Sequence, residues 1–168
     1  MKKNRLFWLV AIVGFILDQG TKLWVVQSFS EIGETIELIP NIFHFTYVVN
    51  TGAAFSLFAE NGEWLRWLSL FVTIGLILFA WFSPRLPKLE QLGYGFVLAG
   101  AAGNGLDRFL FGYVVDFLEF RFIQFPIFNL ADICINFGIL FLILTNFPVF
   151  QRSRRPRNGE QDSNNEQP

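Results

Sequence analysis

The sequence predicts an all-α membrane protein, a four-helix transmembrane bundle that carries a small extracytoplasmic β-sheet. The chain has 168 residues, of which 52% are hydrophobic and 18% aromatic but only 16% charged, which is unusually apolar for a soluble domain of that length. A helix needs about 20 predominantly apolar residues to cross the hydrocarbon core of a bilayer. Four stretches meet this requirement, near residues 6–27, 64–82, 89–110 and 131–150.

The segments between these stretches fit such a bundle. Lipid offers no hydrogen-bond partners to open backbone, so each stretch is expected to be helical. The short Pro-containing turn at 83–88 suits a helical hairpin. The run 41–50 is rich in β-branched and aromatic residues, and the loop 111–128 alternates in part between apolar and polar residues, which indicates half-buried strands. We therefore expect a small sheet on the membrane surface.

The positive charges indicate how the chain is oriented. Short cytoplasmic segments carry an excess of Lys and Arg, whereas the loop 28–63 has neither and contains five Glu residues. Both termini are therefore expected in the cytoplasm, with the loop 28–63 on the opposite side. The basic residues that support this orientation are Lys2, Lys3, Arg5, Arg85, Lys88, Arg152, Arg154, Arg155 and Arg157.

A single membrane-embedded domain is expected over residues 1–150, followed by a polar tail at 151–168 that we expect to be a disordered cytoplasmic end.

The basic N-terminus before an apolar run also fits a cleavable signal peptide. That alternative is weakened because a small-x-small cleavage site is missing, and because Asp18 and Lys22 follow on the same predicted helix. Cys134 is the single cysteine, which excludes an intramolecular disulfide, and it is interpreted as a small packing residue.

Polar residues within the predicted spans lie at similar depths. Counted from the cytoplasmic end of the first span, Asp18 lies about 18 Å in and Lys22 about 24 Å in. On the third span, Asn104, Asp107 and Arg108 lie about 22 to 28 Å in. All of them are therefore expected in the extracytoplasmic half, where the fourth span begins.

The spacing of these residues allows a structural and a functional role. Residues three and four apart share a helix face, as Asp18 does with Lys22, and Asn104 with Asp107 and Arg108. Ionisable groups inside a span need a partner or a function. Mutual neutralisation, Asp18 with Lys22 and Asp107 with Arg108, is the preferred explanation for Asp18, Lys22 and Asp107. For Asn104 and Arg108 both roles stay open.

The third span also has closely spaced glycines that suit close helix packing: Gly93, Gly95, Gly100 and Gly103.

The residue types limit the chemistry that the chain can perform. His44 is the single histidine, so no His-Glu-x-x-His run can hold zinc, and His44 is interpreted as a surface strand residue. The sequence has no Gly-x-Ser-x-Gly elbow for a serine hydrolase. A Ser/Lys dyad would use Lys22, but Asp18 one turn away keeps the ammonium charged, which is the wrong state for a base.

Two carboxylates remain without an obvious cationic partner in the sequence, those of Asp116 and Asp132. They could meet if the connecting loop doubles back as a hairpin. Two close carboxylates cannot both ionise cheaply, so one keeps a proton and can polarise a carbonyl while the other deprotonates water, as in aspartic proteases. The N-terminus of a helix favours the charged form of Asp132, which makes Asp116 the expected proton holder.

Plainer roles stay open for both residues. Asn129 can cap the fourth helix with Asp132 at the third position, and capping alone explains Asp132 about as well. Asp116 can be an exposed loop acid, although its neighbours are wholly apolar. A proton-coupled transporter would also gather polar groups inside a bundle, but it would spread them from face to face. A non-catalytic assembly factor would tolerate amides at both positions.

In five motifs the sequence resembles the bacterial lipoprotein signal peptidases, also called signal peptidase II. Any one motif is weak evidence, but all five in order across residues 6–150 are highly specific. The sequence departs from the family pattern at Ala101 and Ala102, where at least one glycine is frequent, and this affects packing more than catalysis. The five motifs are Asp18-Gln19-Gly20-Thr21-Lys22, Asn50-Thr51-Gly52-Ala53-Ala54-Phe55, Gly100-Ala101-Ala102-Gly103-Asn104-Gly105-Leu106-Asp107-Arg108, Val114-Val115-Asp116-Phe117 and Phe128-Asn129-Leu130-Ala131-Asp132.

The resemblance implies an aspartic endopeptidase of the bacterial inner membrane that needs no metal or other cofactor. Its substrates would be prolipoproteins, cut immediately before a cysteine that carries a diacylglyceryl group. The implied fold has four membrane helices, a small extracytoplasmic sheet and a short interfacial helix. We expect a monomer in contact with membrane lipid, without a nucleic-acid partner. By motif position, Asp116 and Asp132 would be catalytic, Asn50, Asn104, Arg108 and Asn129 would bind substrate, and Asp18 and Lys22 would support the site.

Overall fold

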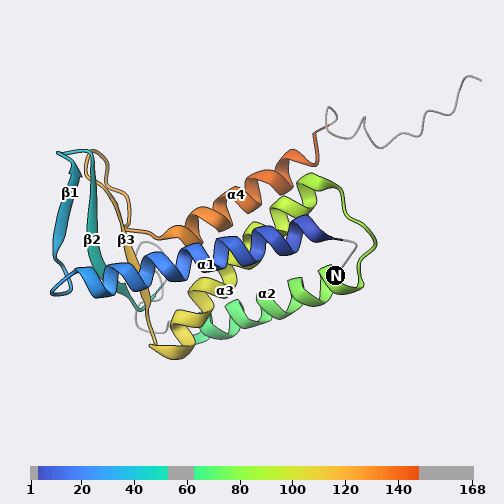
Figure 1. The fold of residues 1–168 in the computed structure, drawn as a ribbon, viewed down its shortest axis with the longest axis horizontal. Helices are drawn as coiled ribbons and strands as arrows, with labels where there is room; N and C mark the ends of the chain where they lie inside the picture. Colours follow the sequence, from blue (N-terminus) through green and yellow to red (C-terminus); the bar gives the residue numbers. More distant parts are fainter. Residues whose placement is uncertain (1–3, 53–62, 148–168) are drawn as a thin grey trace, which may run out of the picture.

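The computed structural model describes residues 4–52 and 63–147. Four helices run alongside one another, and a small sheet lies at one end of them (Figure 1). The predicted tail at 151–168 lies outside the described residues, and the implied interfacial helix is not among the helices found within them. The helices are α1 (Arg5–Ser28), α2 (Glu63–Phe82), α3 (Lys88–Leu110) and α4 (Leu130–Leu144), which begin close to the predicted boundaries.

Helix α4 ends at Leu144, before the predicted boundary at residue 150. The carbonyl of Leu142 accepts hydrogen bonds from Thr145 Oγ1 at 2.6 Å and from Asn146 Nδ2 at 3.2 Å. Side-chain donors therefore compete for a carbonyl that a continuing helix would have used. The amides of Asn146 and Phe147 bond to carbonyls three residues back, which is the pattern of a tightened last turn. The apolar run continues past this point, so hydropathy alone placed the end too late.

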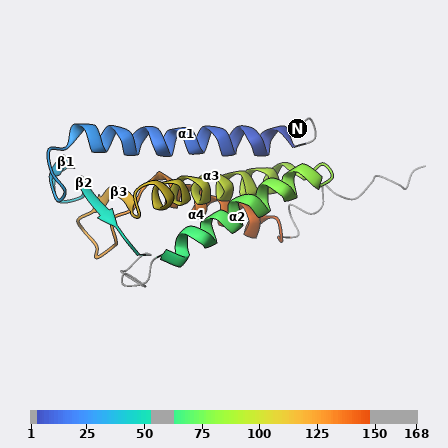
Figure 2. The ribbon, with the colours of Figure 1, turned by 90° about the horizontal axis from the view of Figure 1, so that it is seen from below.

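Helix α3 lies at the centre of the bundle, in contact with the other three helices. Figure 2 shows α1 on one side of it and α2 on the other. The contacts depend on glycine, because a Cβ added at Gly100 would lie 2.2 Å from the carbonyl oxygen of Ala131, and one at Gly95 would lie 2.8 Å from a carbonyl of α1. Gly93 and Gly103 are crowded in the same way, which confirms the close packing that the glycine spacing predicted.

The bundle exposes large apolar side chains and buries several charged and polar ones, which is unusual for a soluble protein. Helices α1 and α2 are long and apolar enough to cross a membrane, whereas α4 is apolar but has only 15 residues. The buried side chains include Asp18, Lys22, Asn104 and Asp107. The exposed surface carries large apolar side chains, among them Leu9, Ile16, Phe71, Leu78, Phe82, Leu140 and Ile143. Such a surface is suited to lipid.

The sheet has three antiparallel strands in the order β1 (Thr35–Ile39), β2 (Phe43–Asn50) and β3 (Val114–Phe120). Strands β2 and β3 confirm the strands predicted in the two loops, although β3 begins earlier than the alternating part, and β1 was not predicted. The Trp24 ring of α1 packs edge-on against Phe45 of β2, with centroids 5.6 Å apart. This aromatic contact fixes the sheet to the end of α1.

The opposite end of the bundle is held by two buried amide side chains. Asn4 Nδ2 donates to the carbonyl of Ala80 at 3.2 Å, and Asn4 Oδ1 accepts from the Leu86 amide at 2.9 Å. Gln91 Oε1 accepts from the amide of Leu6 at 3.2 Å, one of the first-turn donors that a helix leaves unpaired. These bonds join the start of α1 to the α2–α3 turn. The predicted helical hairpin is confirmed, because α2 ends at Phe82, α3 begins at Lys88 and the two helices pack together.

Substitution of Gly100 by alanine should separate α3 from α4, because the group in its way is main chain and cannot move alone. Overpacking of this kind costs about 1 to 3 kcal/mol of the free energy of unfolding. Gly75→Ala on α2 is the matched control, since nothing lies within 4 Å of its added Cβ, and it should be neutral or stabilise by up to about 1 kcal/mol. Unfolding of the purified protein in detergent would measure both changes. Equal effects of the two variants would contradict the packing described.

Candidate active site

Asp116 lies on strand β3, where it pairs with Val48 of β2. After β3 the chain turns back on itself, because the Leu118 amide donates to the Phe128 carbonyl at 2.8 Å and the Phe128 amide donates to the Leu118 carbonyl at 3.1 Å. This confirms the predicted doubling back, which brings the start of α4 beside β3. Asp116 is only 2% exposed, so the alternative of an exposed loop acid is wrong.

Asn129 caps α4 as predicted. Its Oδ1 accepts from the Asp132 amide at 3.1 Å, and Asp132 Oδ2 accepts from the Asn129 amide at 3.2 Å, which completes a capping box. The amide nitrogen of the same side chain donates to Asp116 Oδ1 at 2.6 Å. The cap therefore also links the strand to the helix, and it holds Asp116 next to the helix N-terminus.

The two carboxylates are held by separate amide donors. Asp116 Oδ2 accepts from Asn50 Nδ2 at 2.9 Å, and Asp132 Oδ1 accepts from Asn104 Nδ2 at 2.9 Å. Burial, and then the charge of Asp132, raise the pKa of Asp116 to about 7, although the bonds from Asn50 and Asn129 favour its charged form. Asp116 therefore keeps a proton under conditions in which an ordinary aspartate has lost it.

The ammonium group of Lys22 is the centre of the polar network behind the site. It lies 3.0 Å from Asp18 Oδ2, 2.9 Å from Asp107 Oδ2 and 2.9 Å from Asn104 Oδ1. Three acceptors match the three protons of an ammonium group. The predicted Asp18–Lys22 pair is confirmed. Asp107 pairs with Lys22, so the predicted Asp107–Arg108 neutralisation is not what the structure shows.

The two acids paired with Lys22 each reach the backbone beside a candidate catalytic residue. Asp18 Oδ1 accepts from the amide of Ala131, the neighbour of Asp132, at 2.9 Å. Asp107 Oδ2 accepts from the amide of Val115, the neighbour of Asp116, at 3.3 Å. The ion pairs on α1 and α3 thus position both the helix and the strand that carry the carboxylates.

Gln19 belongs to the same network, and sequence reasoning assigned it no role. Its Nε2 lies 3.1 Å from both Asp18 Oδ2 and Asp107 Oδ1, so it bridges the two acids. The signal was present in the sequence, because Gln19 is adjacent to Asp18 in an otherwise apolar predicted span.

Arg108 borders the site from the last turn of α3. Its Nη2 donates to the Gly52 carbonyl at 3.0 Å and its Nη1 to the Asn104 carbonyl at 3.4 Å. The Gly52 amide donates in turn to Asn50 Oδ1 at 3.0 Å, and Asn50 holds Asp116. Arg108 therefore fixes the end of β2 and the residue that binds the first carboxylate.

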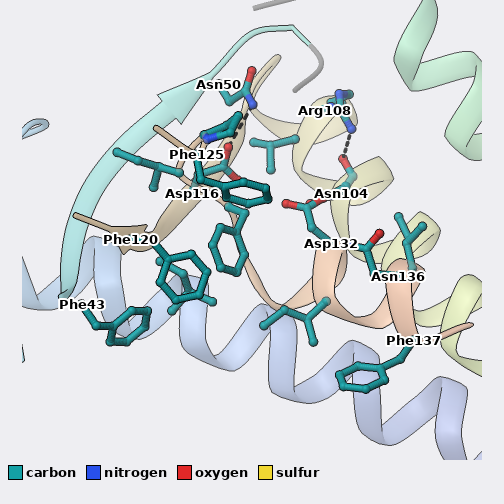
Figure 3. Close-up of a pocket in the computed structure, with 17 residues that line it drawn as sticks. Phe43, Asn50, Asn104, Arg108, Asp116, Phe120, Phe125, Asp132, Asn136 and Phe137 are labelled. Carbon is teal, nitrogen blue, oxygen red and sulfur yellow. Dashed lines mark hydrogen bonds between the residues drawn. The ribbon is translucent and has the colours of Figure 1, made fainter. Parts of the chain in front are cut away.

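Both carboxylates line one cavity of about 760 Å³, together with Asn50, Asn104 and Arg108 (Figure 3). Asn129 lies behind it, fully buried. The rest of the wall is mainly apolar and aromatic: Phe43, Leu118, Phe120, Phe125, Ile127, Phe128, Ile133 and Phe137. One side of the cavity thus presents two acids and amides, and the other suits hydrocarbon.

His44 lies on β2 as predicted, but its side chain is buried rather than on the surface. Its Nδ1 accepts a hydrogen bond from Arg121 Nε at 3.1 Å, and both residues line a separate polar pocket with Thr35 and Glu37. His44 is therefore not part of the cavity that holds Asp116.

An apolar exterior, a buried network of charged side chains and two acids in a cavity together define a membrane protein with an enzyme-like site. The family model for signal peptidase (SPase) II matches residues 10–148 of the chain. A lipoprotein signal peptidase of Gloeothece citriformis is 64% identical over 92% of this chain and 97% of its own length. One of Microcystis aeruginosa is 63% identical over 92% of this chain and 99% of its own length. The chain belongs to the signal peptidase II family, the membrane proteases that process prolipoproteins.

Solved structures agree with this assignment. A bacterial membrane enzyme solved at 2.3 Å resolution superposes with a TM-score of 0.77 at 29% identity, covering 90% of this chain and 92% of its own. A second, solved at 1.9 Å resolution, gives a TM-score of 0.71 at 31% identity and covers 82% and 89% of the two chains.

Replacement of Lys22 by methionine should strongly destabilise the fold, because Asp18 and Asp107 would be left buried without their cation. Breaking a buried pair in this way costs about 3 to 5 kcal/mol of the free energy of unfolding. The control is Arg121→Gln, which removes the cation of an ion pair whose Arg side chain is 42% exposed, together with its hydrogen bond to His44, and should cost about 1 to 2 kcal/mol. Denaturant unfolding in detergent would measure both. Similar losses in the two variants would show that Lys22 is no more important than a surface charge.

Proposed function

We propose that the chain is an aspartic endopeptidase in which Asp116 and Asp132 form the catalytic dyad. It would remove signal peptides from diacylglyceryl-modified prolipoproteins by cutting before the modified cysteine. The observation that carries the proposal is that both carboxylates line one cavity while each has its own amide donor. Membership of a family of lipoprotein signal peptidases supports the substrate class.

In the proposed mechanism the two acids have different protonation states. Asp132 lies in the first turn of α4, where the helix N-terminus and the amide donors favour a carboxylate. Asp116, with a pKa of about 7, carries the proton. Asp132 takes a proton from water, the hydroxide attacks the scissile carbonyl carbon, and Asp116 protonates the oxyanion. Asp132 then passes its proton to the cysteine nitrogen as the C–N bond breaks, and Asp116 regains a proton when the new carboxyl group forms.

The amides around the dyad would have two different tasks. Asn104 and Asn129 are largely occupied by the carboxylates and by each other, with Asn129 Nδ2 lying 3.0 Å from Asn104 Oδ1. These two amides would therefore support substrate binding indirectly, by holding the two acids in place. Asn50 and Arg108 also line the cavity, and we propose that they bind the substrate backbone. The aromatic wall would accommodate apolar substrate groups.

We also propose that all four helices cross the bacterial inner membrane, with both termini cytoplasmic and the sheet extracytoplasmic. Helices α1 and α2 have the required length and hydropathy. The lower apolar content of α3 is consistent with its central position, because the other helices shield it from lipid. Residues 1–150 would then form one membrane domain, active as a monomer. Substrate would enter sideways from the bilayer.

Replacement of either Asp116 or Asp132 by asparagine should abolish cleavage of a diacylglyceryl-modified prolipoprotein peptide in detergent. Loss of one general acid or base lowers kcat by about 10²- to 10⁴-fold. Glu37→Gln is the control, because Glu37 is an exposed acid on β1 outside the cavity. Near wild-type cleavage by either dyad variant would exclude this dyad and favour a non-catalytic role.

Cleavage should also decline as the pH rises through about 7, the pKa of Asp116. Below this pH Asp116 holds the proton that the mechanism requires, and above it both acids are charged. Well above the pKa, kcat/KM should fall about tenfold per pH unit, because kcat/KM reports the pKa of the free enzyme, so the rates are compared at substrate concentrations well below KM. Initial rates measured between about pH 6 and pH 9 would test this, with thermal unfolding at each pH as a control for loss of fold. A flat profile across that range would contradict a proton shared by the dyad.

A further inference from the structure

Asn136 lies in the cavity with the dyad but takes no part in the network described above. It stands four residues after Asp132 on α4, so the two side chains share one helix face. Figure 3 shows both on the same side of α4, and both line the cavity. Asn136 is exposed, and its side chain makes no hydrogen bond within residues 4–52 and 63–147.

The surroundings make this amide unusual. Its neighbours in the chain, Ile135 and Phe137, are apolar, and the rest of α4 beyond Asp132 is almost entirely apolar. An amide that faces hydrocarbon without a partner is costly, so polar residues at membrane depth generally face a partner or a pathway. Asp132 and Asn104 are bonded to protein groups, whereas Asn136 lines the same cavity without a hydrogen-bond partner for its side chain among the described residues.

We propose that the Asn136 side chain binds one peptide group of the signal peptide, about two residues before the scissile bond, and so positions the substrate. This inference rests on the proposed function. Four residues of helix place Asn136 about 6 Å further from the sheet than Asp132, and an extended peptide advances about 3.3 Å per residue. Because α4 runs away from the sheet (Figure 1), that direction leads toward the membrane-embedded signal peptide rather than the mature protein.

The chemistry of the amide favours a peptide group over the lipid. A peptide bond next to the cut must be extended to reach the dyad, so it loses its helical partners and exposes one N–H and one C=O. The Asn136 side chain offers one C=O and an NH₂, which can pair with both. The ester groups of a diacylglyceryl chain only accept hydrogen bonds, so they would pair with the NH₂ group of Asn136 and leave its C=O without a donor.

The assignment is tested by changing the enzyme side chain and the substrate amide, separately and together. The full-length enzyme is compared with Asn136→Leu on a lipid-modified prolipoprotein peptide and on an analogue in which the amide two residues before the cut is replaced by an ester. Leucine suits an apolar helix, so the variant should fold. Asn136→Gln, which keeps the amide, should recover part of the loss. Asn136→Leu/Leu140→Asn moves the amide one turn along α4 to a position outside the cavity lining and should not recover it.

Asn136→Leu should raise KM about 2- to 12-fold, the range that one net hydrogen bond provides, and leave kcat nearly unchanged. The ester should raise KM for the wild type by a similar factor and have little further effect on Asn136→Leu, as expected for two groups that bind each other. An ester effect of equal size in both enzymes, or recovery by the relocated amide, would overturn the assignment alone. Failure of the wild type to cleave would overturn the proposed function as well.

Discussion

The site depends on one buried ammonium group, that of Lys22. Its side chain is only 4% exposed, so each of its three partners offsets part of the cost of removing the charge from water. Asp18 and Asp107 provide the negative charge, and the neutral amide of Asn104 completes the set. These partners also bond to Asp132 and to the backbone of Ala131 and Val115, so the network that holds the buried charge also holds the chain beside both candidate catalytic residues. Stability and site geometry are therefore coupled through one side chain.

The same arrangement makes the two candidate catalytic acids unequal. Asp132 is part of a helix cap and lies where the helix N-terminus favours negative charge. Asp116 lies on a strand between Val115 and Phe117, which belong to an apolar cluster, and burial favours its neutral form by raising its pKa. In the proposed mechanism an acid and a base would thus arise from identical side chains, because one stands at a helix start and the other in a sheet.

The sequence predicted the helices well and the connections between polar residues less well, for physical reasons. Apolar length determined the helices, but strand β3 was placed too late because its first five residues are all buried and show no alternation. Strand β1 is mostly exposed and gave no clear pattern. Asp107 was paired with the adjacent Arg108, yet consecutive helix residues do not face each other, and its real partner is on another helix. Sequence spacing reveals which face a residue occupies but not which helix lies opposite.

The position of the site at the sheet end follows from the backbone as well as from the charges. Non-helical chain at the edge of a membrane exposes main-chain groups that lipid cannot satisfy, so it needs internal partners. At Val115, next to Asp116, the amide donates to Asp107 Oδ2 and the carbonyl accepts from Asn129 Nδ2, each at 3.3 Å. The residues that hold the carboxylates thus also satisfy the open backbone that carries one of them. An acid could be placed on such a strand only where nearby side chains were available for both tasks, and Asp107 in the last turn of α3 and Asn129 at the N-cap of α4 provide them.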